Sequence, residues 1–213
     1  MTTRTTLWLV PALVYAAFAA WYTDFGGPLG EAEITRYADA LHANGVSKER
    51  VATLTRFMQE DNGNQFLMVN ALELNPDPPD VPDAEPGASA EQLMARYMAH
   101  MLPALLKRAC HPVLSGDALF SAMDVVGIDN AEQWQSAAVV RYRSRRSFMQ
   151  IVSDPVFREQ HHFKTAALKK TIAYPIDPQL YLSDPRLLLA LLLVAITALL
   201  DAFLLQPARR PGN

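Results

Sequence analysis

An apolar run near the C-terminal end constrains this chain more than any other feature. It reads "LLLALLLVAITALLDAFLL", residues 187–205, and Asp201 is its only charged residue. A helix needs about 20 mostly apolar residues to cross the hydrocarbon core of a bilayer. The run has that length, so it predicts a C-terminal transmembrane helix. Asp201 is expected near the end of this helix, where its carboxylate can reach the interface.

A second uncharged run, "LWLVPALVYAAFAAWY" at residues 7–22, admits two interpretations. Arg4 before it and the small-residue stretch "AFAA" are typical of a cleaved signal peptide. Trp21 and Tyr22 at its end are instead typical of residues that anchor a helix at the membrane interface. We favour an uncleaved N-terminal transmembrane helix within residues 1–22, and a cleaved signal peptide is the alternative.

The charges that flank the two runs predict how the chain crosses the membrane. Arg4 precedes the first run, and Arg209 and Arg210 follow the second. Because cytoplasmic flanks are enriched in Arg and Lys, both termini are predicted to be cytoplasmic if the first run is uncleaved. Arg186, at the other end of the second run, counts against this orientation. The prediction is a protein of the cytoplasmic (inner) membrane with its soluble domain on the extracytoplasmic side.

Composition and motifs exclude several classes of protein. The 213 residues are 50% hydrophobic and 19% charged, which excludes a disordered chain and suits one compact domain plus membrane segments. The single cysteine, Cys110, excludes an intramolecular disulfide. The sequence contains no CxxC, P-loop, GxGxxG or HExxH motif, and the adjacent His161 and His162 diverge on a helix. We therefore expect neither a cofactor nor a bound metal.

Between the apolar runs, hydrophobic spacing predicts a helical hairpin followed by an α+β domain. Two amphipathic stretches, each ending at Asn-Gly, predict the hairpin within residues 23–63. Residues 64–178 then follow the order β-α-β-β-α-β. The predicted strands are 65–74, 111–120, 134–143 and 171–176, and the predicted helices are 90–109, which opens on the capping box Ser89–Gln92, and Ser144 to about Lys170, which restarts at Ser153–Pro155.

This order predicts a ferredoxin-like fold, an antiparallel four-stranded sheet with both helices on one face. Both faces of the strands are apolar: Ala137 and Val139 point to one side, and Ala138 and Val140 to the other. A large apolar face that no helix covers must be buried by something else. We therefore expect a homodimer, in which a second copy of the sheet covers that face.

Three stretches carry a resemblance to a known group: "FLMVNALEL", "AAVVRYRSRRSFMQIVSDPVFREQ" and "AALKKTIAYPI". With the element order, they make the chain resemble the dimeric α/β-barrel superfamily. Its small, functionally uncharacterised members share a strand followed by S-R-x-x-F, a short helix and S-D-P-x-(Y/F). The resemblance covers roughly half of the chain and implies a dimeric barrel. It implies no single activity, since the superfamily includes cofactor-free monooxygenases, haem-degrading and haem-binding enzymes, lactone isomerases and plain binding domains.

Four arginines crowd into "RYRSRR", residues 141–146. Strand alternation places Arg141 and Arg143 on one face, and Arg145 and Arg146 begin the next helix. Nucleic-acid binding is disfavoured, because the formal net charge of −3 becomes −5 without the three terminal arginines and Asp201. Arg141 and Arg143 can instead bind an anion or carboxylate. We favour a third interpretation, in which they pair with acids such as Glu73 or lie exposed at the rim of the dimer.

Other polar residues give further candidates. His111 begins a predicted strand and can act as a general base. Tyr97 and His100 share one helix and can face a pocket between helix and sheet. Asn70 stands in mid-strand among apolar residues, so its amide is either a structural anchor or the wall of a ligand pocket.

Two functions lead from the sequence, and a scaffold that uses the acidic loop at residues 76–86 stays open as a third. One is a membrane-anchored homodimer that binds a small anionic or apolar ligand through Asn70, Arg141, Arg143 and His100, or that docks another protein. The other is a cofactor-independent monooxygenase- or isomerase-type enzyme, working in the cleft between sheet and helices.

The enzyme requires its catalytic candidates, Tyr97 and His111, to converge in a closed apolar pocket. The binding module is favoured because no acid–base pair has convincing spacing. Separation of the two side chains, with the space between helices and sheet filled by Met68, Met94 or Met98, would count against the enzyme.

Overall fold

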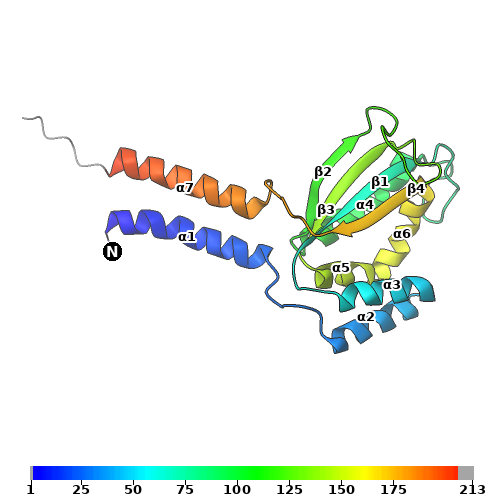
Figure 1. Cartoon of the computed structure of the whole chain (residues 1–213), viewed down its shortest axis with the longest axis horizontal. Helices are drawn as coiled ribbons and strands as arrows, with labels where there is room; N and C mark the ends of the chain where they lie inside the picture. The colour runs from blue at the N-terminus through cyan, green and yellow to red at the C-terminus, as the bar shows by residue number, and fades with distance from the viewer. Residues whose placement is uncertain (1, 206–213) are drawn as a thin grey trace, which may run out of the picture. The chain divides into compact units, whose positions relative to one another are not determined.

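A computed structural model of the protein describes residues 2–205 (Figure 1). The described residues divide into two compact units: residues 2–23 with 179–205, and residues 24–178. The first unit holds two long apolar helices, and the second is a mixed α+β domain. In chain order the elements are α1 (Thr3–Tyr22), α2 (Glu31–Ala43), α3 (Lys48–Gln59), β1 (Phe66–Leu74), α4 (Ala90–Leu106), β2 (His111–Asp117), β3 (Ser136–Tyr142), α5 (Arg145–Val152), α6 (Pro155–Ala167), β4 (Leu168–Ile176) and α7 (Pro185–Leu204).

Strands of the second unit form one four-stranded antiparallel sheet in the order β2-β3-β1-β4. β1 lies inside the sheet, where Asn70 faces Ala138 of β3 and Ala173 of β4. β2 and β4 are the edge strands. The mixed α+β class and the antiparallel sheet predicted from the sequence are confirmed.

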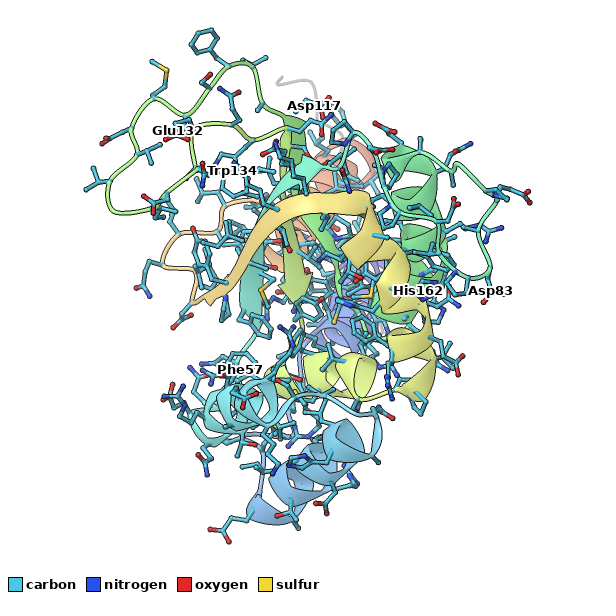
Figure 2. All side chains as sticks on the ribbon, turned by 90° about the vertical axis from the view of Figure 1, so that its right-hand side faces the viewer. Phe57, Asp83, Asp117, Glu132, Trp134 and His162 are labelled. Carbon is cyan, nitrogen blue, oxygen red and sulfur yellow. The ribbon has the colours of Figure 1, made fainter. Side chains whose placement is uncertain are left out.

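Helices α4 and α6 cover one face of this sheet, which we call the helix face (Figure 2). Phe66 and Tyr142 project from neighbouring strands into the core and stack with ring centroids 5.1 Å apart. Leu93 and Tyr97 of α4 and Phe163 of α6 pack over them. Such an aromatic pair adds about 0.5–1.5 kcal/mol beyond the burial of its area. The opposite side of the sheet is called the outer face.

The helical hairpin belongs to the same compact unit as the sheet. Apolar residues of α2 and α3 pack with Met149 of α5 in a second core. Phe57 of α3 joins the two cores, because its ring meets those of Phe66 and Phe148 edge-on at 5.4 and 5.9 Å. The hairpin is therefore an integral layer beneath α5.

Local signals explain where several helices begin. The Ser89 hydroxyl accepts a hydrogen bond from Gln92 N, and Ser89 N donates to Gln92 Oε1, so the predicted capping box is confirmed. Asp154 caps α6, with Pro155 at its first position. Ser144 caps α5 by accepting from Ser147 N.

Three predicted boundaries are wrong, and one of them is the end of α4, at Leu106 instead of residue 109. The helix expected to reach about Lys170 ends at Ala167, because Leu168 already pairs with Leu74 in the sheet and ladder pairing outweighs the helical spacing. The second predicted strand, 111–120, ends at Asp117. Beyond that residue the chain leaves the sheet in an 18-residue loop, 118–135, that returns to β3.

In the other unit, α1 and α7 are long and apolar enough to cross a membrane, judged by length and composition. They run antiparallel and in contact. At one end Arg4 pairs with Asp201 at 2.7 Å. At the other end Arg186 donates to the Thr23 hydroxyl at 3.1 Å, and its guanidinium lies 5.5 Å from the centre of the Tyr22 ring.

Candidate functional site

Arg141 is fully buried on the outer-face side of β3, which the sequence did not anticipate. Its Nε donates to Gln65 Oε1 at 2.7 Å, and its Nη1 donates to the Ala109 carbonyl at 2.6 Å. Ala109 has a φ of 53°, in the left-handed region where a residue with a Cβ is strained. The guanidinium therefore holds the tight turn between α4 and β2, which is a structural task.

Arg143 lies just past the end of β3, half-buried, and its backbone N–H donates to Cys110 Sγ at 3.3 Å. Glu73, the acid suggested as an arginine partner, instead pairs with Lys169 and Lys170 of β4. The expectation that Arg141 is exposed or paired with Glu73 is thus wrong. Ladder register explains the difference, because Lys170 lies directly opposite Glu73.

Asn70 is buried on the helix face of β1. Its side-chain Nδ2 donates to the Met68 carbonyl at 3.0 Å and to the Ala138 carbonyl at 3.3 Å. Both bonds go to the backbone of the sheet, so the amide anchors β1 against β3. Of the two interpretations open from the sequence, this geometry favours the structural anchor.

Tyr97 projects from α4 into the core, where it lies among aromatic groups of α6. Its ring meets those of Phe157 and His161 edge-on at 6.5 and 6.1 Å, and Lys164 Nζ lies 5.7 Å from its centre. Burial raises the pKa of Tyr97 to about 12 and lowers that of His161 to about 4, so at neutral pH both are uncharged. His100, one turn along α4, is only partly buried.

The structure does not bring the two catalytic candidates together. His111 lies opposite Arg141 on the outer face of the sheet, and its Nδ1 is 2.9 Å from the carbonyl oxygen of Pro112. Tyr97 belongs to the core on the helix face. The sheet separates the two side chains. Three methionines pack against the core between helices and sheet, namely Met68, Met94 and Met98.

Arg145 and Arg146, at the start of α5, bind the helical hairpin to that helix. Arg146 donates to both carboxylate oxygens of Glu33, at 2.8 and 3.0 Å, and to the backbone carbonyls of Gly27 and Pro28. Arg145 donates to the Phe57 carbonyl and stacks over the Phe57 ring at 4.4 Å. The sequence placed both arginines at a helix start but gave them no partners.

Three acids of the hairpin segment complete this network, Asp24, Glu33 and Asp61. Hydrogen bonds from Arg146 lower the pKa of Glu33 to about 2. Burial alone would raise the pKa of Asp24, but hydrogen bonds from Ser144, at 2.5 Å, and Gly26 N hold it below its usual value. These acids lie within residues 23–63, which the sequence predicted as a hairpin, but only Glu33 stands in the first turn of a helix, so there was no local sequence signal for Asp24 and Asp61.

The outer face of the sheet carries a row of exposed apolar side chains. Along β4, Ile172, Tyr174 and Ile176 are 42%, 48% and 37% exposed, and on the other edge Leu114 is 65% exposed. Ladder register places all four on the side away from α4 and α6, because they lie opposite Ala71, Val69, Leu67 and Val139. The described chain covers one end of this face, where Leu67 and Arg141 are buried, and leaves these four apolar side chains exposed.

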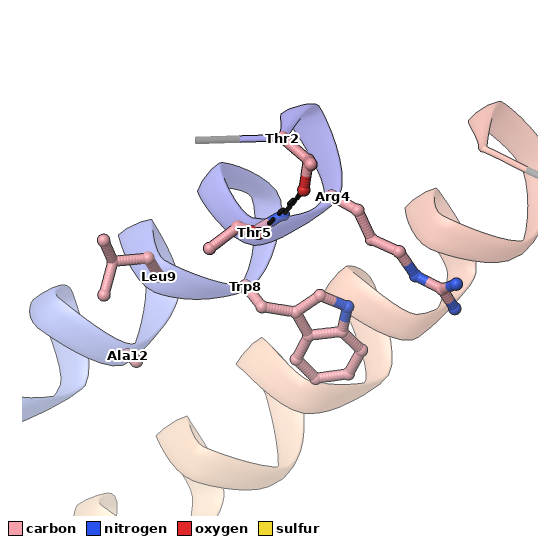
Figure 3. Close-up of a pocket in the computed structure, with 6 residues that line it drawn as sticks. All are labelled: Thr2, Arg4, Thr5, Trp8, Leu9 and Ala12. Atoms are coloured by element: carbon pink, nitrogen blue, oxygen red, sulfur yellow. Dashed lines mark hydrogen bonds between the residues drawn. The ribbon is translucent and has the colours of Figure 1, made fainter.

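A shallow depression lies along α1 and is lined by residues of that helix alone: Thr2, Arg4, Thr5, Trp8, Leu9 and Ala12 (Figure 3). Its polar groups are engaged. The Thr2 hydroxyl caps the helix by accepting from Thr5 N, and Arg4 pairs with Asp201. The depression is part of a helix end, and we assign it no ligand.

Comparison with known proteins supports the fold alone. No family model matches the chain, and no curated protein matches it. A solved structure of RPA0582, a protein of unknown function from Rhodopseudomonas palustris, is 21% identical with a TM-score of 0.51, over 63% of this chain and 95% of that chain. A structure of the methylated RPA0582 protein is 22% identical to this chain with a TM-score of 0.51, and the match covers 63% of this chain and 93% of that chain. At3g17210 from Arabidopsis thaliana, at a TM-score of 0.34, is too remote to carry an argument.

Proposed function

We propose that this protein is a membrane-anchored homodimeric interaction module of the dimeric α/β-barrel kind. Two features support the architecture. The order β2-β3-β1-β4, with α4 after β1 and α5 and α6 after β3, agrees with ferredoxin-like topology. The apolar helices α1 and α7 are long enough to hold it at the inner membrane. The flanking arginines are the reason for proposing that the α+β unit lies on the extracytoplasmic side.

The uncovered outer face is the observation that carries the proposal. Isolated apolar side chains on a surface need no explanation, but a contiguous row across a sheet marks an interaction site. A second copy of the same face is self-complementary about a two-fold axis, and two sheets stack about 10 Å apart.

Protein interaction is preferred to catalysis or to ligand binding inside the domain for a geometric reason. Tyr97 and His111 lie on opposite faces of the sheet. Two of the ligand-binding candidates, Arg141 and Asn70, donate hydrogen bonds to amide and carbonyl oxygens of the protein itself. The exposed surface of the domain is therefore the better candidate for function.

The mass of the full-length protein in mild detergent tests the proposal, measured by light scattering on a sizing column. The wild type is expected to be a dimer, and Ile172→Asp is expected to shift it towards monomer, because a carboxylate cannot be buried unpaired between two sheets. Val156→Asp is the matched control, since Val156 on α6 is 44% exposed against 42% for Ile172.

Circular dichroism checks that both variants are folded, because each must retain the wild-type spectrum. A monomeric wild type, or an Ile172→Asp variant as dimeric as the control, would overturn the proposal.

A further inference from the structure

We infer that residues 118–135, the loop between β2 and β3, form an arm that packs on the second copy of this chain. The inference rests on the proposed homodimer and adds a second contact to it. A ten-residue stretch inside the arm carries five large apolar side chains that are exposed: Leu119 at 101%, Phe120 at 79%, Met123 at 91%, Val126 at 83% and Ile128 at 57%. These exposures exceed most of those on the sheet itself.

The arm has a defined shape despite its exposure. Two backbone bonds join its outgoing and returning segments, from Ala118 N to Gln135 O and from Ala122 N to Glu132 O, both at 2.8 Å. The Gln133 amide also donates to the Ser121 hydroxyl at 2.8 Å. A segment already held in one conformation loses little entropy when it binds. The base of the arm, residues 118–122 and 132–135, is therefore preorganised, and the five apolar side chains between and beside these bonds are exposed.

Contacts at its base place the arm beside the outer face. Lys170 of β4 donates to the Asn130 carbonyl and lies 4.7 Å from the centre of the Trp134 ring. Lys170 faces Glu73 on the outer side of the sheet. Figure 2 agrees, because the segment with Glu132 and Trp134 lies on the side away from α4 and α6. Whatever covers the outer face must meet the arm.

The apolar area also favours a dimer that includes the arm. A stable interface buries about 800 Å² on each partner. Four side chains on the sheet, three of them less than half exposed, offer only part of that. One buried aromatic side chain contributes roughly 150–250 Å², so Phe120 and its four neighbours add several hundred.

Lipid is the competing occupant, and the topology argues against it. The arm leaves the sheet where β2 ends, opposite the start of β3. Both connections to the apolar helices leave from the opposite end: Asp24 is held by Ser144 just past β3, and Ile176 ends β4 beside Leu67. Strands of this length separate the two ends by about 20–30 Å.

The charge of the arm also argues against lipid. The arm contains three acids, Asp124, Asp129 and Glu132, and no lysine or arginine. Segments that lie in the interface of an anionic membrane carry Lys and Arg beside their apolar residues. A protein surface fits the arm better than a bilayer, and continuity with the outer face identifies that surface as the second copy.

Photo-crosslinking of the full-length protein in its membrane tests the inference. Photoreactive p-benzoylphenylalanine replaces Phe120 in one variant, Ile172 in a second and Val156, on the helix side, in a third. After irradiation of membrane vesicles, covalent dimers are separated and the joined peptides are mapped by mass spectrometry. We expect dimers from positions 120 and 172, with the position-120 link ending on the outer face or the arm of the other copy, and none from position 156.

The outcomes separate the inference from the proposal beneath it. Dimers from position 172 with position 120 linked to lipid, to another protein or to nothing would overturn the arm and leave the homodimer standing. Dimers from neither position would overturn both. As a second measurement, Met123→Asp is expected to raise the dimer dissociation constant at least tenfold in detergent, and an unchanged constant would also overturn the arm.

Discussion

At the scale of single residues, Arg146 is the clearest case of an arginine used for folding rather than for ligand binding. Its side chain is 16% exposed and makes four hydrogen bonds to the hairpin segment. Bonds to charged groups contribute about 1.5–3 kcal/mol each, and removing the side chain breaks its bonds to Glu33 and to the Gly27 and Pro28 carbonyls together. This arginine therefore holds the hairpin against α5.

Removing that side chain should be costly, while removing a neighbouring arginine should not. We expect Arg146→Ala to lower the free energy of unfolding by about 2–4 kcal/mol. Arg36→Ala is the control, because Arg36 reaches the same Glu33 at 3.9 Å but is 67% exposed, and such surface pairs contribute about 0–1 kcal/mol. Urea unfolding of the two variants in detergent checks the difference. Equal losses would contradict the role given to Arg146.

Glu33 predicts how the same contact responds to acid. Hydrogen bonds from Arg146 hold its folded pKa at about 2, below the ordinary value of 4.5. A carboxyl with a depressed folded pKa contributes its stability fully above the ordinary value and loses it as the pH falls through the folded value. Wild-type stability should therefore fall between pH 4.5 and 2 more steeply than that of Glu33→Gln. Denaturant midpoints across that range decide it, and parallel curves would refute the linkage.

At the scale of elements, periodicity in the sequence was enough for most of the domain. The apolar spacing of α2 and α3, the buried run of β1 and the caps of α4 and α6 are local signals, and local signals survive without knowledge of the fold. The α6–β4 boundary failed because Leu168 belongs to a helix by spacing and to a strand by its partner Leu74. Pairing between residues so far apart in the chain has no local signature.

The candidate residues were harder to predict than the elements, for a related reason. Strand alternation correctly placed Arg141 on the side of Val139, but the turn at Ala109 that accepts its hydrogen bond lies 32 positions away. The arm at 118–135 was missed because its first residues, Leu119 and Phe120, continue the apolar pattern of β2. A sequence does not distinguish an apolar residue that is buried in a core from one that is exposed for binding another protein.

At the scale of the whole molecule, contacts within the helix pair bear on the proposed membrane topology. Arg186 counts against the predicted orientation as an isolated charge. In the structure it donates to both carboxylate oxygens of Asp184, at 3.1 and 2.6 Å. Nearby carboxylates contribute little to the positive-inside rule, so Arg186 still counts against the predicted orientation. Arg4, paired with Asp201 in the other helix, gives α1 a structural use that a cleaved signal peptide would lose.

Single cysteines test both the retention of α1 and the orientation of the pair. A maleimide that cannot cross membranes should label Glu159→Cys, on α6, in intact spheroplasts, and should label Thr2→Cys only after permeabilisation. Native Cys110 does not interfere, because it is fully buried and burial raises its pKa, which keeps the thiol protonated and unreactive. The unmodified protein is the control for that background. If Thr2→Cys stays unlabelled after permeabilisation while Glu159→Cys reacts, the first helix has been removed. Labelling of Thr2→Cys in intact spheroplasts would reverse the orientation, and the arm and the outer face would then meet their partner in the cytoplasm.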